Sequence, residues 1–327
     1  MDIGCLFRTL RHLKPTQLSH QLWYRAAGTL GLSKPRSIRL EGASLADWSS
    51  FSFTPPAGAQ ACRSLRDPAF SFIGLEHCFP ERINWDGAGL GKLWDYNLHY
   101  FEWIFGLSVR DAKSVVSDWI ERHPYRQGAV GWDPYPASLR LMNWAAFWST
   151  SGAAIVAGDA DFRRDLSDAM GVQCEWLRRR LEKHLLGNHL LENGAALWMA
   201  GHFIEHPQAL EWRRIGSNIL RWQLQEQILD DGMHFERSPM YHNRLIHMLE
   251  WLCRVPVDED ALHLSTYLQR AKDAGSRLRH PDGRIALFND SAFGIYPEPA
   301  DVAESKGTFA LRDAGYYGSR TERNDYV

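Results

Sequence analysis

Between about residue 92 and residue 280 the chain repeats one pattern, in which an apolar residue recurs at every third or fourth position. That spacing puts the apolar side chains on one face of an α-helix, so each run predicts a helix with one buried side. The runs are Ala112 to Ile120, Phe162 to Leu181, Leu186 to Ile204, Trp212 to Trp222, Tyr241 to Leu252 and Leu264 to Leu278. Helix follows helix with little strand between them, which favours an all-α fold.

Short turn signals separate these runs: Gly158-Asp159, His206-Pro207, Asp230 to Gly232 and Pro256 to Asp260. Helices joined by short connections pack as antiparallel hairpins. Because the chain has no exact internal repeat, the common short-period solenoids are disfavoured. Over residues 91–283 the pattern therefore predicts stacked helix hairpins, arranged either as a solenoid or as a closed or open (α/α) toroid.

The two flanking parts lack this pattern. Residues 1–90 indicate an N-terminal arm and an irregular wrap with a few short strands, because prolines such as Pro55-Pro56, Pro68 and Pro80 break helices. Towards the other end, residues 284–288 and 308–312 predict strands, and residues 315–318 a turn. So few strands do not make a stable sheet alone. Residues 284–327 therefore either pack on the helices or begin a β domain that is incomplete.

Composition narrows the class of protein. With 45% hydrophobic residues, 23% charged residues and a net charge of −2, the chain is typical of a soluble protein. That charge gives no argument for a nucleic-acid or membrane partner. Five scattered cysteines without a CxxC pair support neither a zinc site nor a disulfide framework. Because the N-terminus lacks the apolar core of a secretion signal, we expect a cytoplasmic protein, or a periplasmic one if the start is misassigned.

The stretch Gly187 to Asn193 places polar side chains at the start of a predicted helix. Asn188 is suited to the N-cap position. His189 and Glu192 are three residues apart and share one helix face. The plain interpretation is a capping amide, a surface histidine and a glutamate that favours the helix dipole.

The stretch Glu236 to His242 has the same character. Ser238 is suited to the N-cap and Pro239 to the first helical position, so Tyr241 falls in the first turn. Arg237 and the helix dipole would both lower the pKa of Tyr241. The plain interpretation is that Tyr241 only begins the apolar face of its helix.

Together the two stretches suit one reaction, which is removal of the C5 proton of a uronic acid. Negative charge then builds on the adjacent carboxylate and has to be neutralised. Asn188, His189 or a protonated Glu192 could do so. Tyr241 or a histidine could take the proton or protonate the departing glycosidic oxygen. The product would be a 4,5-unsaturated sugar.

In this order, the stretches resemble the heparinase II/III family of polysaccharide lyases. The likeness covers roughly residues 90–320 and consists of Trp94 to Trp103, Gly131 to Pro136, Ser138, Arg140, Asn143-Trp144, Gly187 to His189, Ser238 to His242, and Asp282 to Asp290. The resemblance implies an incomplete (α/α) toroid followed by an antiparallel β-sandwich. It also implies β-elimination on an acidic polysaccharide, which could be heparan-like, alginate-like or a bacterial exopolysaccharide.

Residue by residue, the resemblance implies that Asn188 and His189 neutralise the substrate and that Glu192 is an additional carboxylic acid. It implies that Tyr241 is the catalytic acid and base, with His242 beside it. The predicted substrate-binding residues either stack on and hydrogen-bond sugars or fill the core, and they are Trp94, Tyr96, Asn97, His99, Tyr100, Trp132, Tyr135, Arg140, Asn143, Trp144 and Arg237.

The chain departs from the family in one respect. The family places a further catalytic histidine, and in some members a metal site, in the β-sandwich, whereas the last histidine here is His280. We therefore expect a truncated sandwich, impaired activity and no cofactor. Two alternatives remain open. One is a non-catalytic glycan-binding or assembly protein. The other is a toroidal glycoside hydrolase, which would need two facing carboxylic acids.

Overall fold

The computed structural model describes residues 15–29, 34–35, 38–62, 64–65, 68–185, 187–257, 261–296 and 307–321. The α-helices in this part of the chain are α2 (Pro15–Thr29), α3 (Lys92–Tyr100), α4 (Val109–Arg122), α5 (Pro134–Ser149), α6 (Ala153–Gly158), α7 (Ala160–Leu177), α8 (Gly187–Phe203), α9 (Ala209–Gln227), α10 (Pro239–Leu252) and α11 (Leu264–Arg277). Short 3-10 helices cover Ala57–Gln60, Glu102–Gly106 and Val130–Trp132. The all-α prediction is confirmed, and no helix within these ranges is long and apolar enough to cross a membrane.

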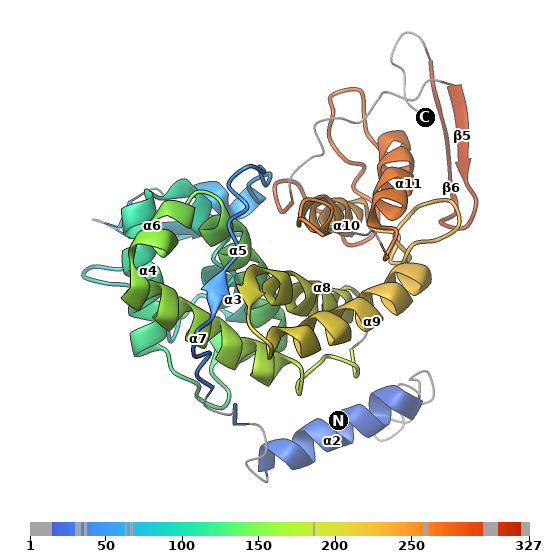
Figure 1. Ribbon diagram of the computed structural model, residues 1–327. Helices are drawn as coiled ribbons and strands as arrows, with labels where there is room; N and C mark the ends of the chain where they lie inside the picture. The colour runs from blue at the N-terminus through green and yellow to red at the C-terminus, as the bar shows by residue number, and fades with distance from the viewer. Residues whose placement is uncertain are drawn as a thin grey trace.

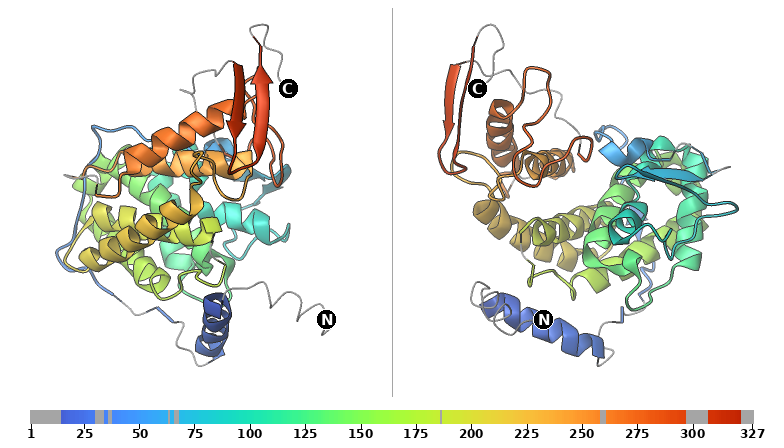
Figure 2. Two further views of the ribbon diagram at one scale, coloured as in Figure 1. Left: turned by 90° about the vertical axis from the view of Figure 1, so that its right-hand side faces the viewer. Right: turned by 180° about the vertical axis from the view of Figure 1, so that it is seen from behind.

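Helices α3 to α9 form the main body, in which α8 packs against α5 on one side and α9 on the other (Figure 1). Helix α2 lies along the outside of this body and contacts the segment between α7 and α8, where Gln17 Nε2 donates to the carbonyl oxygen of His184 at 3.1 Å. Helices α10 and α11 lie beside the body together with a C-terminal strand pair (Figure 2). The N-terminus of α10 therefore faces the body across the connection that follows α9. This arrangement brings the stretch Gly187 to Asn193 close to the stretch Glu236 to His242.

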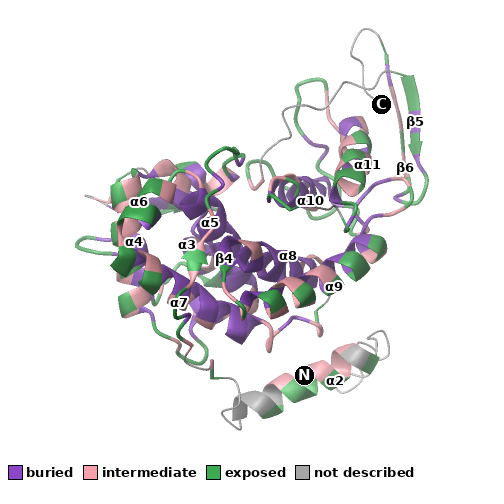
Figure 3. Cartoon of the chain, viewed as in Figure 1, coloured by how far each residue is buried: buried purple, intermediate pink, exposed green. Residues whose placement is uncertain are grey.

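Burial explains which helices the apolar pattern revealed. In α4 the buried residues are Ala112, Val115, Val116 and Trp119, which is the predicted face. By contrast, every residue from Tyr135 to Ser149 of α5 is buried. A helix that is covered on all sides has no polar face and so shows no 3.6-residue pattern. Figure 3 shows α5 and α8 as largely buried, whereas α4, α9 and α11 each present an exposed side.

The helix starts agree with the sequence at α10 and differ at α8. Ser238 caps α10 by accepting a hydrogen bond from the backbone N–H of Tyr241 at 3.3 Å, and Pro239 is the first helical residue, as predicted. Helix α8 begins at Gly187, so the prediction of Asn188 as the N-cap is wrong. Gly187 has a φ of 57°, and a Cβ there would lie 2.9 Å from Glu236 Oε1. Both constraints favour glycine at this helix start.

The strands form antiparallel pairs only. Strand β1 (Ser44–Leu45) pairs with β4 (Ile204–Glu205), β2 (Ala69–Phe72) with β3 (Leu75–Cys78), and β5 (Gly307–Leu311) with β6 (Tyr316–Arg320). Phe309 and Leu311 of β5 are buried in one cluster with Ala274 and Leu278. The C-terminal hairpin therefore packs on helix α11, which is one of the two possibilities raised by the sequence.

Several predicted boundaries are wrong. Residues 284–288 are not a strand, because their only ladder contact is a single bridge between Arg279 and Ile285. Residues 316–318 belong to β6 and not to a turn. Leu181 follows the end of α7, and Ile204 begins β4. Trp222 lies on the predicted face of α9 but is 50% exposed. Leu186 lies outside the described residues.

Candidate functional site

The N-terminal turns of α8 and α10 lie together, although their residues are about fifty positions apart in the sequence. Glu236, just before α10, accepts a hydrogen bond from the backbone N–H of Asn188 at 3.5 Å. One turn further along each helix, Arg244 donates to both carboxylate oxygens of Glu192 at 2.6 and 2.8 Å. These contacts bring together the two stretches that carry the predicted catalytic residues.

His189 is held by a carboxylate from outside its helix. Its Nδ1 lies 3.0 Å from Oε1 of Glu182, and its ring lies 4.4 Å from the Tyr135 ring, centre to centre. Burial lowers the pKa of His189, but the hydrogen bond and charge of Glu182 more than offset it, so the pKa lies above its ordinary value. A raised pKa favours the imidazolium form, which is suited to neutralising a substrate carboxylate.

Glu182 is itself fixed by Asn193 of α8. Asn193 Nδ2 donates to Glu182 Oε2 at 3.0 Å, and the backbone N–H of Glu182 donates to Asn193 Oδ1 at 2.8 Å. Asn193 Nδ2 also donates to Ser138 Oγ at 3.0 Å. Both Glu182 and Asn193 are buried. This network orients the imidazole of His189 from behind.

Glu192 forms an ion pair with a residue of the other helix. It is buried beside the guanidinium of Arg244. Burial lowers the pKa of Arg244, but the charge of Glu192 more than reverses that effect, and the pKa lies well above its ordinary value. Bidentate pairs of arginine with a carboxylate are strong and fix both side chains. In this structure Glu192 therefore joins α8 to α10, and its role as a carboxylic acid stays a prediction.

Tyr241 is half-buried, and its hydroxyl donates to Asp290 Oδ2 at 3.3 Å. Burial, followed by the charges of Asp290 and Glu236, raises the pKa of Tyr241. The predicted lowering of this pKa is therefore wrong. Arg237 does not provide it, since its Nη2 donates to the carbonyl oxygen of Asp313 at 3.1 Å.

One carboxylate acts on both Tyr241 and His189. The charge of Glu236 raises the pKa of both groups. The phenol and the imidazole therefore both lie within the electrostatic influence of the Glu236 carboxylate.

His242 points away from this junction. It is completely buried, its Nδ1 accepts from the backbone N–H of His234 at 3.2 Å, and its Nε2 donates to the carbonyl oxygen of Ala271 at 2.8 Å. Burial lowers the pKa of His242 to about 4. Both ring nitrogens are thus used within the core, which argues against the predicted catalytic role.

Most of the predicted substrate-binding residues are core residues. Trp94, His99, Trp132, Arg140, Asn143 and Trp144 are all buried. Trp94 Nε1 donates to the carbonyl oxygen of Leu75 at 3.1 Å, and Asn143 Nδ2 donates to that of Tyr100 at 2.9 Å. Arg140 donates to Gln173 at 2.8 Å and lies over the Trp119 ring. Their polar atoms face the interior, so these side chains hold the helices together.

The other predicted substrate-binding residues lie in two different places. Tyr135 contacts His189, and Tyr100 packs edge-on against Tyr135 at 5.9 Å, so both lie behind the imidazole. Tyr96 donates to Asp133 at 2.7 Å, and Asn97 donates to the carbonyl oxygen of Leu93 at 2.8 Å, so both are partly exposed on α3. The structure thus brings Tyr100 and Tyr135, but not Tyr96 or Asn97, against the catalytic candidates.

Residues 289–296 contribute side chains that the sequence did not single out. Asp290 bonds Tyr241, and its carbonyl oxygen accepts from Ser238 Oγ at 2.8 Å. Further along, the Tyr296 ring lies 5.7 Å from the Arg244 guanidinium. The sequence showed Asn289-Asp290 only as part of the family likeness, and no spacing rule linked Glu182 or Arg244 to the site. Within the described residues no cluster of three histidine, cysteine or acidic side chains could hold a metal ion.

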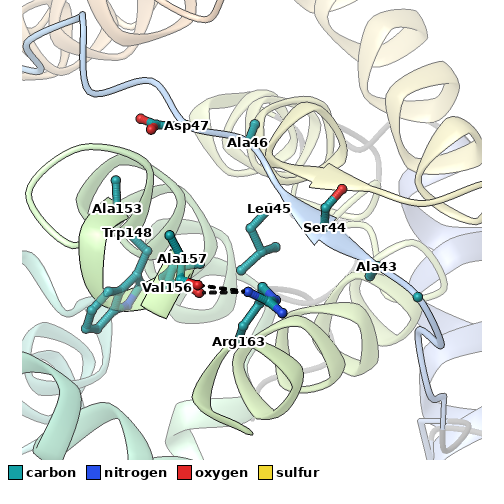
Figure 4. A pocket seen from close by; sticks show the side chains of 11 residues that line it. Ala43, Ser44, Leu45, Ala46, Asp47, Trp148, Ala153, Val156, Ala157 and Arg163 are labelled. Atoms are coloured by element: carbon teal, nitrogen blue, oxygen red, sulfur yellow. Dashed lines mark hydrogen bonds between the residues drawn. The ribbon is translucent and has the colours of Figure 1, made fainter. Parts of the chain in front are cut away.

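A separate pocket of about 410 Å³ lies between β1 and helices α6 and α7 (Figure 4). It is lined by Gly42, Ala43, Ser44, Leu45, Ala46, Asp47, Trp148, Ala153, Val156, Ala157 and Arg163. The Arg163 guanidinium in this pocket donates to the carbonyl oxygens of Val156 and Ala157 at 3.2 and 3.3 Å. None of the predicted site residues lines it, so it carries no part of the proposed chemistry.

Comparisons with known proteins show which family the chain resembles. The family model described as Heparinase II/III N-terminus matches residues 110–295. A heparin-sulfate lyase from Pedobacter heparinus is 39% identical over 146 residues, which are 43% of this chain and 20% of that protein. A heparin-sulfate lyase from Bacteroides stercoris is 39% identical over 57 residues, which are 17% of this chain and 9% of that protein.

Solved structures support the fold. The crystal structure of a mutant heparan sulfate lyase from Pedobacter heparinus has a TM-score of 0.55 at 18% identity, covering 93% of this chain and 54% of that chain. The structure of a heparinase III has a TM-score of 0.53 at 17% identity, covering 84% of this chain and 47% of that chain. The toroid prediction is confirmed by this likeness. The chain spans about half the length of these structures and a fifth or less of the sequence relatives.

Proposed function

The chain belongs to the heparinase II/III family, and we propose that it provides the helical part of a polysaccharide lyase site. The proposed reaction is β-elimination on a glycosaminoglycan that contains uronic acid. The names of the sequence relatives favour heparan-sulfate-like polymers over alginate or other exopolysaccharides as the first substrates to test.

One observation carries the proposal: His189, whose pKa Glu182 raises, and the phenol of Tyr241 stand on two helix starts that Glu236 joins. When the C5 proton leaves a uronic acid, negative charge develops on the adjacent carboxylate. A fixed cation at His189, with the amide of Asn188 next to it, would stabilise that charge without reorganising. This is the neutralising role that the family likeness implies for both residues.

Tyr241 is proposed as the proton-transferring group. Its raised pKa keeps the phenol protonated at neutral pH, which suits donation to the departing glycosidic oxygen. The Asp290 carboxylate accepts the hydrogen bond of the phenol at 3.3 Å and so orients the hydroxyl. Asp290 is therefore proposed as the positioning partner of Tyr241.

A second candidate function is glycan binding without turnover. The carboxylate of Glu192 is engaged by Arg244, and the raised pKa of Tyr241 makes its phenolate harder to form. Both features would slow catalysis and leave the binding groups in place. Such a protein would bind the same acidic polymers through His189 and Asn188.

The test is to incubate the protein with heparan sulfate, heparin, alginate and a bacterial uronic-acid exopolysaccharide, and to follow near-ultraviolet absorbance. A lyase creates a conjugated double bond, so absorbance should rise with at least one polymer and should fail to rise for Tyr241→Phe. Tyr317→Phe, on strand β6, is the matched control. Binding without absorbance would favour the second candidate. New reducing ends without absorbance would indicate a hydrolase and contradict both proposals.

A further inference from the structure

We propose that Phe288 and Tyr316 form an aromatic platform that binds a second sugar ring of the polymer, next to the unit held at Tyr241. The inference rests on the proposed substrate class and adds a subsite outside the predicted site residues. Its occupant is a pyranose ring of a uronic-acid polymer, which would stack on the open face of Phe288.

The two rings are nearly parallel, with centres 5.1 Å apart and an angle of 19° between their planes. Phe288 is 43% exposed, and its neighbours Leu287 and Phe293 are exposed as well. A group of exposed apolar side chains is uncommon on a soluble protein unless it binds something. A flat, open aromatic face suits the apolar face of a sugar ring.

The platform is held in a fixed orientation. The Tyr316 hydroxyl donates to the carbonyl oxygen of Arg237 at 2.6 Å and accepts from Asn289 Nδ2 at 3.0 Å. Asn289 Nδ2 also donates to the Arg237 carbonyl oxygen at 2.6 Å. Rings anchored in this way lose little further freedom when a ligand binds, which favours affinity.

Backbone strain marks the same junction. Arg237 and Asn289 have φ values of 56° and 51°, a region that residues with a side chain rarely adopt. The two strained residues are also directly hydrogen-bonded to each other. Strain of this kind persists where surrounding contacts enforce it, and it concentrates at binding and catalytic sites.

The platform is close enough to Tyr241 to share a ligand with it. Phe288 is two residues before Asp290, so their Cα atoms are at most about 7 Å apart, and Asp290 contacts the Tyr241 hydroxyl. The exposed side chain of Arg237, fixed by its bond to Asp313, adds a cation at the same place. An aromatic face beside a cation matches a sugar that carries a carboxylate or sulfate.

The experiment compares Phe288→Ala, Phe288→Tyr and Tyr317→Ala for binding of a uronic-acid monosaccharide and a heparan-sulfate hexasaccharide, measured by titration calorimetry. Tyr317 is 69% exposed and follows Tyr316 on the strand, so its side chain faces the opposite way. For Phe288→Ala we expect the Kd of the hexasaccharide to rise about fivefold to tenfold, from loss of the buried ring face. The monosaccharide, whose single ring occupies the position at Tyr241, should bind unchanged.

Phe288→Tyr should retain hexasaccharide binding because it keeps the ring, and Tyr317→Ala should behave as the wild type. Unchanged hexasaccharide binding in Phe288→Ala would overturn the platform, as would an equal loss for both ligands. If Phe288→Ala changes the self-association of the protein and leaves its glycan affinity unchanged, the exposed aromatic patch is a protein-docking surface. That result would also overturn the platform proposal. Absorbance measurements on the same samples test the lyase proposal separately. If the protein binds the hexasaccharide through Phe288 but makes no unsaturated product, the platform proposal is supported and the lyase proposal is contradicted.

Discussion

His189 depends on a carboxylate that its own helix does not supply. Glu182 lies seven residues earlier, outside any helix, and reaches His189 because Asn193 bonds both its backbone and its side chain. Because the pKa of His189 is raised in the folded protein, its contact with Glu182 stabilises the fold as well as favouring the imidazolium form. That contribution is complete below the unfolded pKa of about 6.5 and is lost as the pH rises through the higher folded value.

Glu182→Gln should lower the pKa of His189, because the charge that offsets burial is removed while the burial remains. If the imidazolium is the active form, the alkaline limb of the kcat/KM profile should move to lower pH. The measurement is kcat/KM against pH together with an NMR titration of His189. Glu211→Gln, which breaks an exposed pair with Arg214, is the control. An unchanged profile would show that Glu182 does not set the charge of His189.

Buried histidines elsewhere should make the protein sensitive to acid. Burial lowers the pKa of His242 to about 4 and that of His234 to about 3, so both are neutral when folded. The unfolded chain binds their protons near pH 6.5, and stability should therefore fall as the pH drops from about 6.5 towards 4. Each unit of pKa difference corresponds to about 1.4 kcal/mol.

The measurement is the free energy of unfolding by denaturant at a series of pH values. His242→Gln removes one of these groups and should flatten the acid slope, even if it lowers stability at neutral pH. A slope equal to that of the wild type would mean that His242 is not the buried neutral group that its two hydrogen bonds indicate.

At the scale of the elements, the pair Glu192–Arg244 links α8 to α10. Arg244→Met should destabilise the fold by about 3–5 kcal/mol, because it leaves a buried carboxylate without a partner. Adding Glu192→Leu should recover much of that loss, since the double variant buries no charge. Arg214→Met, in an exposed pair on α9, should cost less than about 1 kcal/mol.

Denaturant unfolding of the two single variants and the double variant measures this coupling. A double variant as unstable as the sum of the two single ones would contradict it.

The sequence predicts a helix well when one face of the helix is exposed to solvent and the opposite face is buried. Helices α4, α9 and α11 each keep an exposed side, and the apolar spacing revealed all of them. The spacing also revealed α8 and α10, although both are largely buried. Helix α5 did not stand out because neighbours cover it on every side. Residues 284–288 form an apolar run that suggested a strand, but they pair only at the single bridge between Arg279 and Ile285.

The site was less predictable than the fold, because its geometry comes from contacts between distant segments. Local patterns predicted Ser238 as a cap and Tyr241 in the first turn. They did not reveal that Asp290 approaches Tyr241, that Arg244 neutralises Glu192, or that His242 faces the core. The pKa of Tyr241 was predicted in the wrong direction for the same reason. The roles proposed for Asn188, His189 and Tyr241 stay predictions.

At the scale of the whole molecule, the proposed site has two halves, one from the toroid body and one from the α10–α11 group. His189 and its supporting network belong to the body, whereas Tyr241, Asp290 and the Phe288–Tyr316 platform belong to the other group. If both halves act on one sugar, a change in either half should disable the same chemical step. Changing both halves at once should then lower the reaction rate little more than changing one half.

The most direct test is the rate of near-ultraviolet absorbance on heparan sulfate for the wild type, His189→Ala, Tyr241→Phe and the double variant. We predict that each single change lowers kcat about 100-fold or more. The double variant should be no slower than the slower single one. A fully active Tyr241→Phe, or two losses that multiply in the double variant, would contradict a single site built from both helix starts.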